Sequence, residues 1–197
     1  MATQTRERIL DATAELFRRH GYTGTGLKQI VAAASAPFGS VYHHFPGGKE
    51  QLGAEVVLRS GRMYFELFEL IFDAEPDPLE AVRGFFLGAG ETLRVTDYAD
   101  ACPIGTVALE VASTNEPLRL ATAEVFEDWI VRGAARFEGL GLEPAAARAL
   151  IIQFVALLEG AFMLARAAKS LEAMERAAEA AVALTRAALQ QSVDTAG

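Results

Sequence analysis

Apolar positions follow the 3.6-residue period of helices along most of the chain. Ile9, Thr13, Leu16 and Phe17 recur at spacings of three and four, so they occupy one face of a helix over residues 3–20. Gly21 can adopt the left-handed conformation that ends this helix. The same pattern predicts helices over residues 25–34, 37–43, 49–72, 79–95, 104–112, 116–139, 144–168 and 171–191. We therefore expect an all-α chain of about nine helices.

The first three predicted helices are close together and the second of them is short. Ser35, Ala36 and Pro37 form a tight turn between the second and the third, with Pro37 placed at the first position of the third helix. Two helices joined in this way are typical of a helix-turn-helix, whose second helix enters the DNA major groove with its N-terminal residues against base edges. Compact helix pairs also occur without any binding function, so the pattern leaves both interpretations open.

Charge is unevenly distributed along the 197 residues. Residues 1–50 carry six lysine or arginine residues against four acidic ones, a net charge of +2, whereas the whole chain carries −8 and residues 51–197 therefore −10. A mildly basic first segment on an acidic chain suits a DNA-binding protein, because phosphate contacts supply much of such a protein's affinity. A chance excess of two charges would look the same.

Three other classes of protein are disfavoured. All three histidines lie at or before residue 44, so residues 51–197 cannot build a Ser-His-Asp or Cys-His site alone, and we expect no enzyme. One cysteine allows no disulfide framework and no cysteine-rich metal site, so we expect a cytoplasmic protein without metal or cofactor. The apolar stretch 149–165 contains Glu159 and is shorter than the roughly 20 residues of a membrane span, which favours a helix buried in a core or against a partner subunit.

Two sequence motifs carry a family resemblance. Residues 6–55, above all Tyr42-His43-His44-Phe45 followed by Lys49-Glu50 and Leu52, resemble the TetR family of bacterial regulators. Residues 102–105, Cys-Pro-Ile-Gly, are similar to a subgroup that includes the LmrA and YxaF regulators. The resemblance implies a helix-turn-helix DNA-binding domain over residues 1–48, and an effector-binding and dimerisation domain over residues 49–197. It also implies a homodimeric repressor that a small apolar or aromatic effector releases from a palindromic operator.

The resemblance assigns candidate DNA contacts residue by residue. Thr25 resembles the N-cap of the first helix of the pair, as a phosphate contact or as a cap alone. Lys28 resembles a basic backbone-contacting position or is a solvated charge, and Tyr42 resembles a phosphate-binding tyrosine or is a half-buried ring. Lys49 resembles the lysine that opens the fourth helix toward the DNA backbone. His43 is a further candidate, because its ring can donate a hydrogen bond to a phosphate or to guanine. The exposed start of the recognition helix completes the set: Pro37, Phe38, Gly39 and Ser40.

Three positions depart from the family pattern. Ser35 stands where a glycine is usual in the turn, Gly26 where a hydroxyl residue is usual, and Phe38 where a basic or small polar residue is common. A left-handed conformation at Ser35 would cost roughly 1 kcal/mol. These departures leave an alternative open: a small-molecule binding protein of the same fold that has lost sequence-specific DNA binding.

Many bulky apolar side chains lie beyond residue 49. Most are expected to form the core, and the resemblance implies that some line an effector cavity, with a flavonoid-type compound as one candidate. We assign this role to Phe65, Phe68, Phe86, Cys102, Phe126, Trp129 and Phe162. The last two helices carry more apolar groups than one small core can hide, which predicts a four-helix dimer interface. Close approach there would use a stripe of mostly small residues: Met174, Ala177, Ala178, Ala181, Leu184, Thr185 and Ala188.

Overall fold

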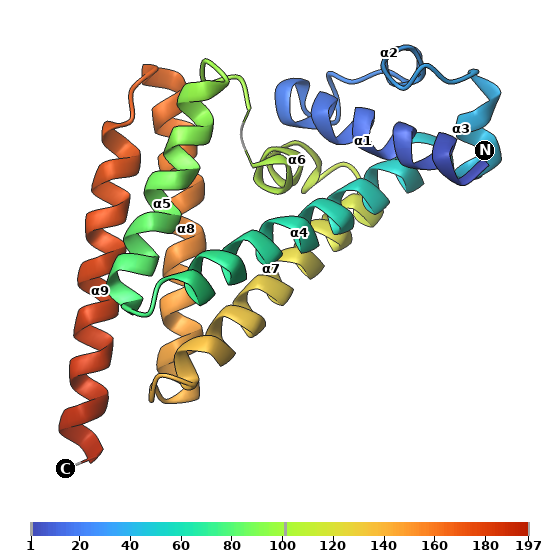
Figure 1. Cartoon of the computed structure of the whole chain (residues 1–197). Coiled ribbons are helices and arrows are strands. Elements are labelled where there is room, and N and C mark those ends of the chain that lie inside the picture. Colours follow the sequence, from blue (N-terminus) through green and yellow to red (C-terminus); the bar gives the residue numbers. More distant parts are fainter. Residues whose placement is uncertain (1, 101, 197) are drawn as a thin grey trace. The chain divides into compact units, whose positions relative to one another are not determined.

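The structure, a computed structural model, describes residues 2–100 and 102–196. Within these residues the chain forms nine helices and no strand, which confirms the predicted all-α class. The helices, labelled in Figure 1, are α1 (Ala2–His20), α2 (Leu27–Ala33), α3 (Gly39–His44), α4 (Gly48–Ala74), α5 (Pro78–Val95), α6 (Pro103–Val111), α7 (Glu116–Glu138), α8 (Pro144–Ala168) and α9 (Glu172–Ala196). Each lies where a helix was predicted, with bounds within a few residues.

The packing divides the chain into two compact units. We call residues 1–63 and 101–125 the head and residues 64–100 and 126–197 the body. The two units alternate along the chain, and α4 and α7 each contribute to both. The predicted boundary at residue 48, between a DNA-binding and an effector-binding domain, does not coincide with the boundary between these two units, and it stays a prediction.

The head is built around α1, against which α2 and α3 pack. Its innermost side chains are fully buried and come from all of the first four helices: Ile9, Phe17, Ile30, Val41, Phe45 and Leu52. Gly21 ends α1 with φ +70°, as predicted from its position after the helix. The apolar face of each short helix is thus turned inward, and the opposite faces of α2 and α3 are turned to solvent.

The turn between α2 and α3 contains a left-handed residue. Ser35 has φ +48°, the conformation for which glycine is usual, and the N–H of Ala36 donates to the Val31 carbonyl at 2.9 Å. The prediction that Pro37 opens α3 is wrong, because α3 begins at Gly39 and Phe38 is its N-cap. Phe38 already has helical torsion angles, φ −55° and ψ −41°, so its side chain projects in the direction of the α3 side chains.

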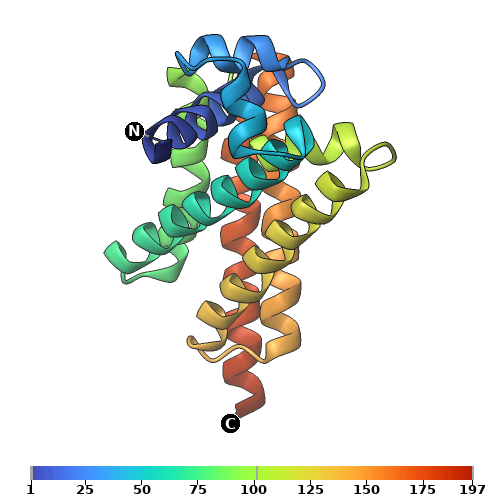
Figure 2. The ribbon, with the colours of Figure 1, turned by 90° about the vertical axis from the view of Figure 1, so that its right-hand side faces the viewer.

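In the body, α5, α8 and α9 lie side by side, as both views show (Figures 1 and 2). Phenylalanine rings fill its interior in a connected series of contacts. Phe68 lies 4.3 Å from Phe72, and Phe86 lies 5.8 Å from Phe154, measured between ring centroids. Because such rings bury large apolar areas, this cluster supplies much of the body's stability.

The stripe of mostly small residues on α9 faces this same core. Met174, Ala177, Ala178, Ala181 and Thr185 are all buried within the chain. A Cβ atom added to Gly90 of α5 would lie 3.2 Å from Cβ of Met174, which shows how closely α5 and α9 approach. The prediction that this stripe is available to a second subunit is therefore wrong, because helices of the same chain cover it.

Helix α8 keeps much of its apolar surface uncovered. By length and composition alone it is apolar enough to cross a membrane, and 28% of its most apolar stretch is buried. Ile152 is 45% exposed and Met163 61% exposed. Eleven residues separate these two, which is three helical turns, so they lie on the same face.

Candidate DNA-binding site

The helix-turn-helix presents most of the predicted DNA contacts to solvent. Lys28 on α2 is exposed, as are Tyr42 and His43 on α3. Pro37, Phe38 and Gly39 are exposed at the start of the recognition helix, and Ser40 is half-buried. Residues 21–48 contain one lysine, two histidines and no acidic residue. This segment therefore offers a surface without negative side chains, as an approach to phosphates requires.

Thr25 is placed differently from its prediction. The N-cap of α2 is Gly26, whose N–H donates to Oε1 of Gln29 at 2.7 Å. The Thr25 side chain is fully buried, and its hydroxyl donates to the Gly21 carbonyl at 2.7 Å. Its side chain satisfies a carbonyl at the end of α1, so the predicted N-cap role is wrong, and the predicted phosphate contact at this helix start stays a prediction.

Lys49 points toward the turn between α1 and α2. Its ammonium donates to the Tyr22 carbonyl at 2.7 Å and lies 4.1 Å from the centroid of the Tyr22 ring. Burial lowers the pKa of Lys49, and the nearby carboxylate of Glu110 opposes that change. Burial also raises the pKa of Tyr22, and Glu50 raises it further. Lys49 thus stabilises the loop that leads into α2, and its direct contact with phosphate stays a prediction.

Glu110 of α6 also contacts this turn. Its Oε2 accepts from the Thr23 N–H at 2.7 Å. A Cβ atom at Gly21 would lie 1.7 Å from its Oε1, so a side chain at position 21 would displace this carboxylate. Sequence reasoning missed this residue, because 87 positions separate it from Thr23 and no local pattern connects them.

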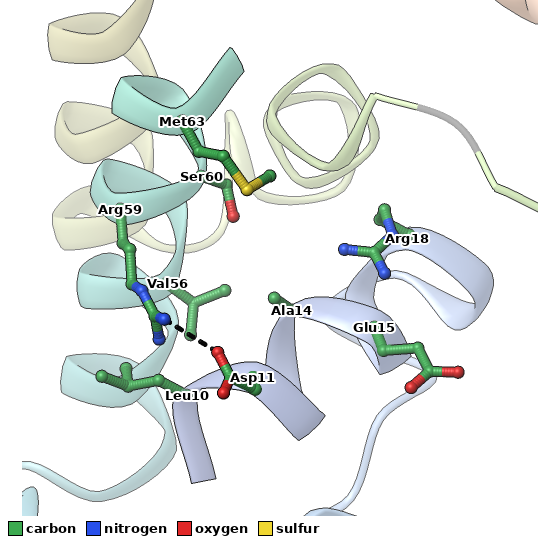
Figure 3. Close-up of a pocket in the computed structure, with 9 residues that line it drawn as sticks. All are labelled: Leu10, Asp11, Ala14, Glu15, Arg18, Val56, Arg59, Ser60 and Met63. Carbon is green, nitrogen blue, oxygen red and sulfur yellow. Dashed lines mark ion pairs between the residues drawn. The ribbon is translucent and has the colours of Figure 1, made fainter. Parts of the chain in front are cut away.

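Ion pairs join α1 to α4 within the head. Arg59 pairs with Asp11 at 2.8 Å and with Glu7 at 3.3 Å, and Arg6 pairs with Glu55. Beside Arg59 lies an open pocket of about 300 Å³ between α1 and α4, with the Arg59–Asp11 pair at its edge (Figure 3). Its lining contains none of the predicted effector residues: Leu10, Asp11, Ala14, Glu15, Arg18, Val56, Arg59, Ser60 and Met63.

The predicted effector residues divide between the two units. Phe65, Phe68 and Phe86 are buried in the body core, and Trp129 and Phe162 pack against it partly buried. Phe126 lies 5.8 Å from Trp129, measured between ring centroids. Cys102 belongs to the head, where its Sγ accepts from the Gly105 N–H at 3.4 Å as the N-cap of α6. The shared effector role of these residues stays a prediction.

Among the described residues, no group of three or more histidine, cysteine or acidic side chains could hold a metal ion.

Comparison with known proteins decides the family. The family described as bacterial regulatory proteins, tetR family, matches residues 9–56, and the C-terminal domain of LmrA/YxaF-like transcriptional regulators matches residues 78–180. The chain belongs to the TetR family. The regulator YxaF of Bacillus subtilis is 36% identical to it over 160 residues, which are 81% of this chain and 84% of YxaF. The regulator LmrA of the same organism is 34% identical over 166 residues, 84% of this chain and 88% of LmrA.

A solved TetR-family structure has the same fold. The TetR transcriptional regulator of Legionella pneumophila superposes with a TM-score of 0.78 at 25% identity, covering 89% of this chain and 94% of that one. The first family match runs from the middle of α1 to the start of α4, and the second runs from α5 to the middle of α9. Both resemblances stated from the sequence motifs are confirmed, and the chain is a DNA-binding transcriptional regulator.

Proposed function

We propose that this TetR-family regulator is a homodimeric repressor of the cytoplasm, which a small apolar or aromatic effector releases from a palindromic operator. The observation that carries the proposal is the solvent-facing edge of α2 and α3, free of acidic residues and bearing Lys28, Tyr42 and His43. Repression is the usual mode of the family that the sequence resembles. An isologous dimer would present two such edges to successive turns of a symmetric site.

The departures from the family pattern leave the motif geometry intact. Ser35 adopts the left-handed conformation in place of glycine, and Gly26 still caps α2 through the side chain of Gln29. Phe38 and its neighbours are exposed rather than folded inward. These observations favour a protein that binds DNA over one that has lost this function.

Selection from random duplexes tests DNA binding and yields the operator. On the selected duplex, Lys28→Ala is expected to weaken binding to all sequences alike. It should reduce the slope of log affinity against log salt concentration by about 0.9 for each lost phosphate contact. Lys169→Ala is the matched control, because it removes an exposed positive charge from the body. Equal salt slopes for the two variants in gel-shift titrations would contradict a DNA-binding surface on α2 and α3.

The exposed face of α8 supports the dimer. Ile152 and Met163 present apolar surface on one side of this helix, and burial against a partner would remove that surface from water. We expect the wild-type protein to sediment at twice its chain mass of 21.1 kDa at micromolar concentration, and Ile152→Glu with Met163→Glu to sediment as a monomer. A wild-type monomer in analytical ultracentrifugation would contradict the dimer.

Trp129 offers a direct probe of effector binding. It is the single tryptophan of the chain and lies partly buried against the aromatic core. Titration with a flavonoid is expected to change its fluorescence and to release the protein from its operator over the same concentration range. Release without any change in fluorescence would place the effector away from Trp129.

A further inference from the structure

Phe38 is exposed in a unit that buries its other phenylalanine rings. Phe17 and Phe45 are 0% exposed, whereas Phe38 is 47% exposed. Four residues further on, Tyr42 is 52% exposed, and the two ring centroids lie 6.1 Å apart with planes inclined by 57°. Because the torsion angles of Phe38 are already helical, the two side chains project from adjacent turns of one helical face. Together they form an aromatic surface that runs from the N-cap of the recognition helix along its exposed face.

A benzyl group can read only one feature of the DNA major groove. Base edges there present hydrogen-bond donors and acceptors, which a phenylalanine cannot pair. The one apolar group in the groove is the C5-methyl of thymine. An aromatic ring at this position therefore gains most binding free energy by covering a thymine methyl. At the other base pairs it would remove polar base edges from water and offer them no hydrogen bond in return.

We infer that Phe38 is a specificity-determining residue that contacts a thymine methyl in each half of the operator, with the Tyr42 ring beside it. The inference rests on the proposed function, because it requires α3 to enter the major groove. It assigns one thymine per half-site to Phe38 and leaves the phosphate contacts to Lys28 and to the Tyr42 hydroxyl.

The magnitude follows from the size of a methyl group. Burial of one such group changes an affinity about fourfold, so its loss from both half-sites should weaken binding about fifteenfold. This change is well resolved in a titration.

Deoxyuridine substitution removes the methyl alone and tests the inference. Starting from the duplex selected with the wild-type protein, each symmetric pair of thymines is replaced by deoxyuridine, and the affinities of the wild type and of Phe38→Ala are measured at one salt concentration. One pair is expected to show the fifteenfold loss with the wild type and almost none with Phe38→Ala. At every other pair the two proteins should respond equally.

Lys28→Ala is the matched control, because it should weaken binding to every duplex by the same factor and keep the deoxyuridine loss at the assigned pair. If Phe38→Ala binds too weakly to titrate, Phe38→Leu, with its smaller apolar surface, is expected to reduce that loss. Deoxyuridine losses that are the same in the wild type and in the Phe38 variants would overturn the inference and leave the proposed function standing. A failure to select any duplex would instead contradict the proposed function.

Discussion

Aromatic side chains have opposite positions in the recognition helix and in the body. In the body, Phe86 is 0% exposed and its ring contacts those of Phe85 and Phe154 edge-on. At the N-cap of α3 and within this helix, Phe38 and Tyr42 turn about half of their surface to solvent. The same kind of residue therefore stabilises the fold in one place and, in our proposal, contacts a ligand in the other. Composition alone does not separate these roles, but burial does.

The largest expected effect comes from the body. Phe86→Ala should lower the free energy of unfolding by about 3–5 kcal/mol, because it removes a fully buried ring and leaves a cavity among its neighbours. Denaturant titration followed by circular dichroism measures this change. A loss below about 1 kcal/mol would show that the core collapses around the missing ring, and would weaken the contrast with α3.

An intermediate effect on stability is expected at Gly21, where the Glu110 carboxylate lies against the turn between α1 and α2. Gly21→Ala introduces a side chain at φ +70° and into the space of the Glu110 carboxylate. We expect a loss of about 2 kcal/mol in stability, combining left-handed strain with the lost Thr23–Glu110 hydrogen bond. Affinity for the operator should also fall, because this turn leads into α2.

Gly84→Ala provides the control for that substitution. Gly84 lies inside α5, and an added Cβ atom meets nothing within 4 Å. Alanine there should raise stability by about 0.5–1 kcal/mol, since it restricts the unfolded chain and favours helix. A loss of stability at Gly84 as large as that at Gly21, in the same unfolding experiment, would contradict the expectation that the left-handed φ and the Glu110 contact set the cost at Gly21.

The smallest effect on stability is expected at Phe38. Phe38→Ala should change the free energy of unfolding by less than about 0.5 kcal/mol, because an exposed ring contributes little to the core. Its effect on operator affinity should be much larger. A destabilisation comparable to that of Phe86→Ala, measured under the same conditions, would mean that the Phe38 ring serves the fold and would remove the contrast altogether.

The helical layout could be predicted from the sequence because its signals are local. Apolar periodicity located all nine helices of the described residues, and glycine after the first helix marked its end. The family resemblance rests on the consecutive residues Tyr42-His43-His44-Phe45 and on the nearby Lys49, which can be recognised without knowing the fold. Most of the predicted DNA-contacting residues of α2 and α3 are exposed as expected, because the apolar period of each short helix shows which face is buried.

The errors concern contacts whose partner is distant or ambiguous. Thr25 has the residue type and position of an N-cap, but its hydroxyl bonds to the Gly21 carbonyl in the folded head. The small residues of α9 would suit a partner helix as well as α5 of the same chain. Glu110 carries no local signal, since its role depends on the fold bringing α6 to the turn at Thr23. Only a three-dimensional arrangement distinguishes these possibilities.

The composition of the head from two stretches of chain has a consequence for engineering its specificity. Leu118 and Tyr22 both approach Gly53, and Asn115 donates to Glu50 at 2.8 Å, so residues 101–125 complete the surface on which the helix-turn-helix rests. In a chimera that takes only residues 1–63 from this protein, α2 and α3 would pack in a head whose α6 comes from another protein. To transplant the operator preference, recombination should exchange both stretches together.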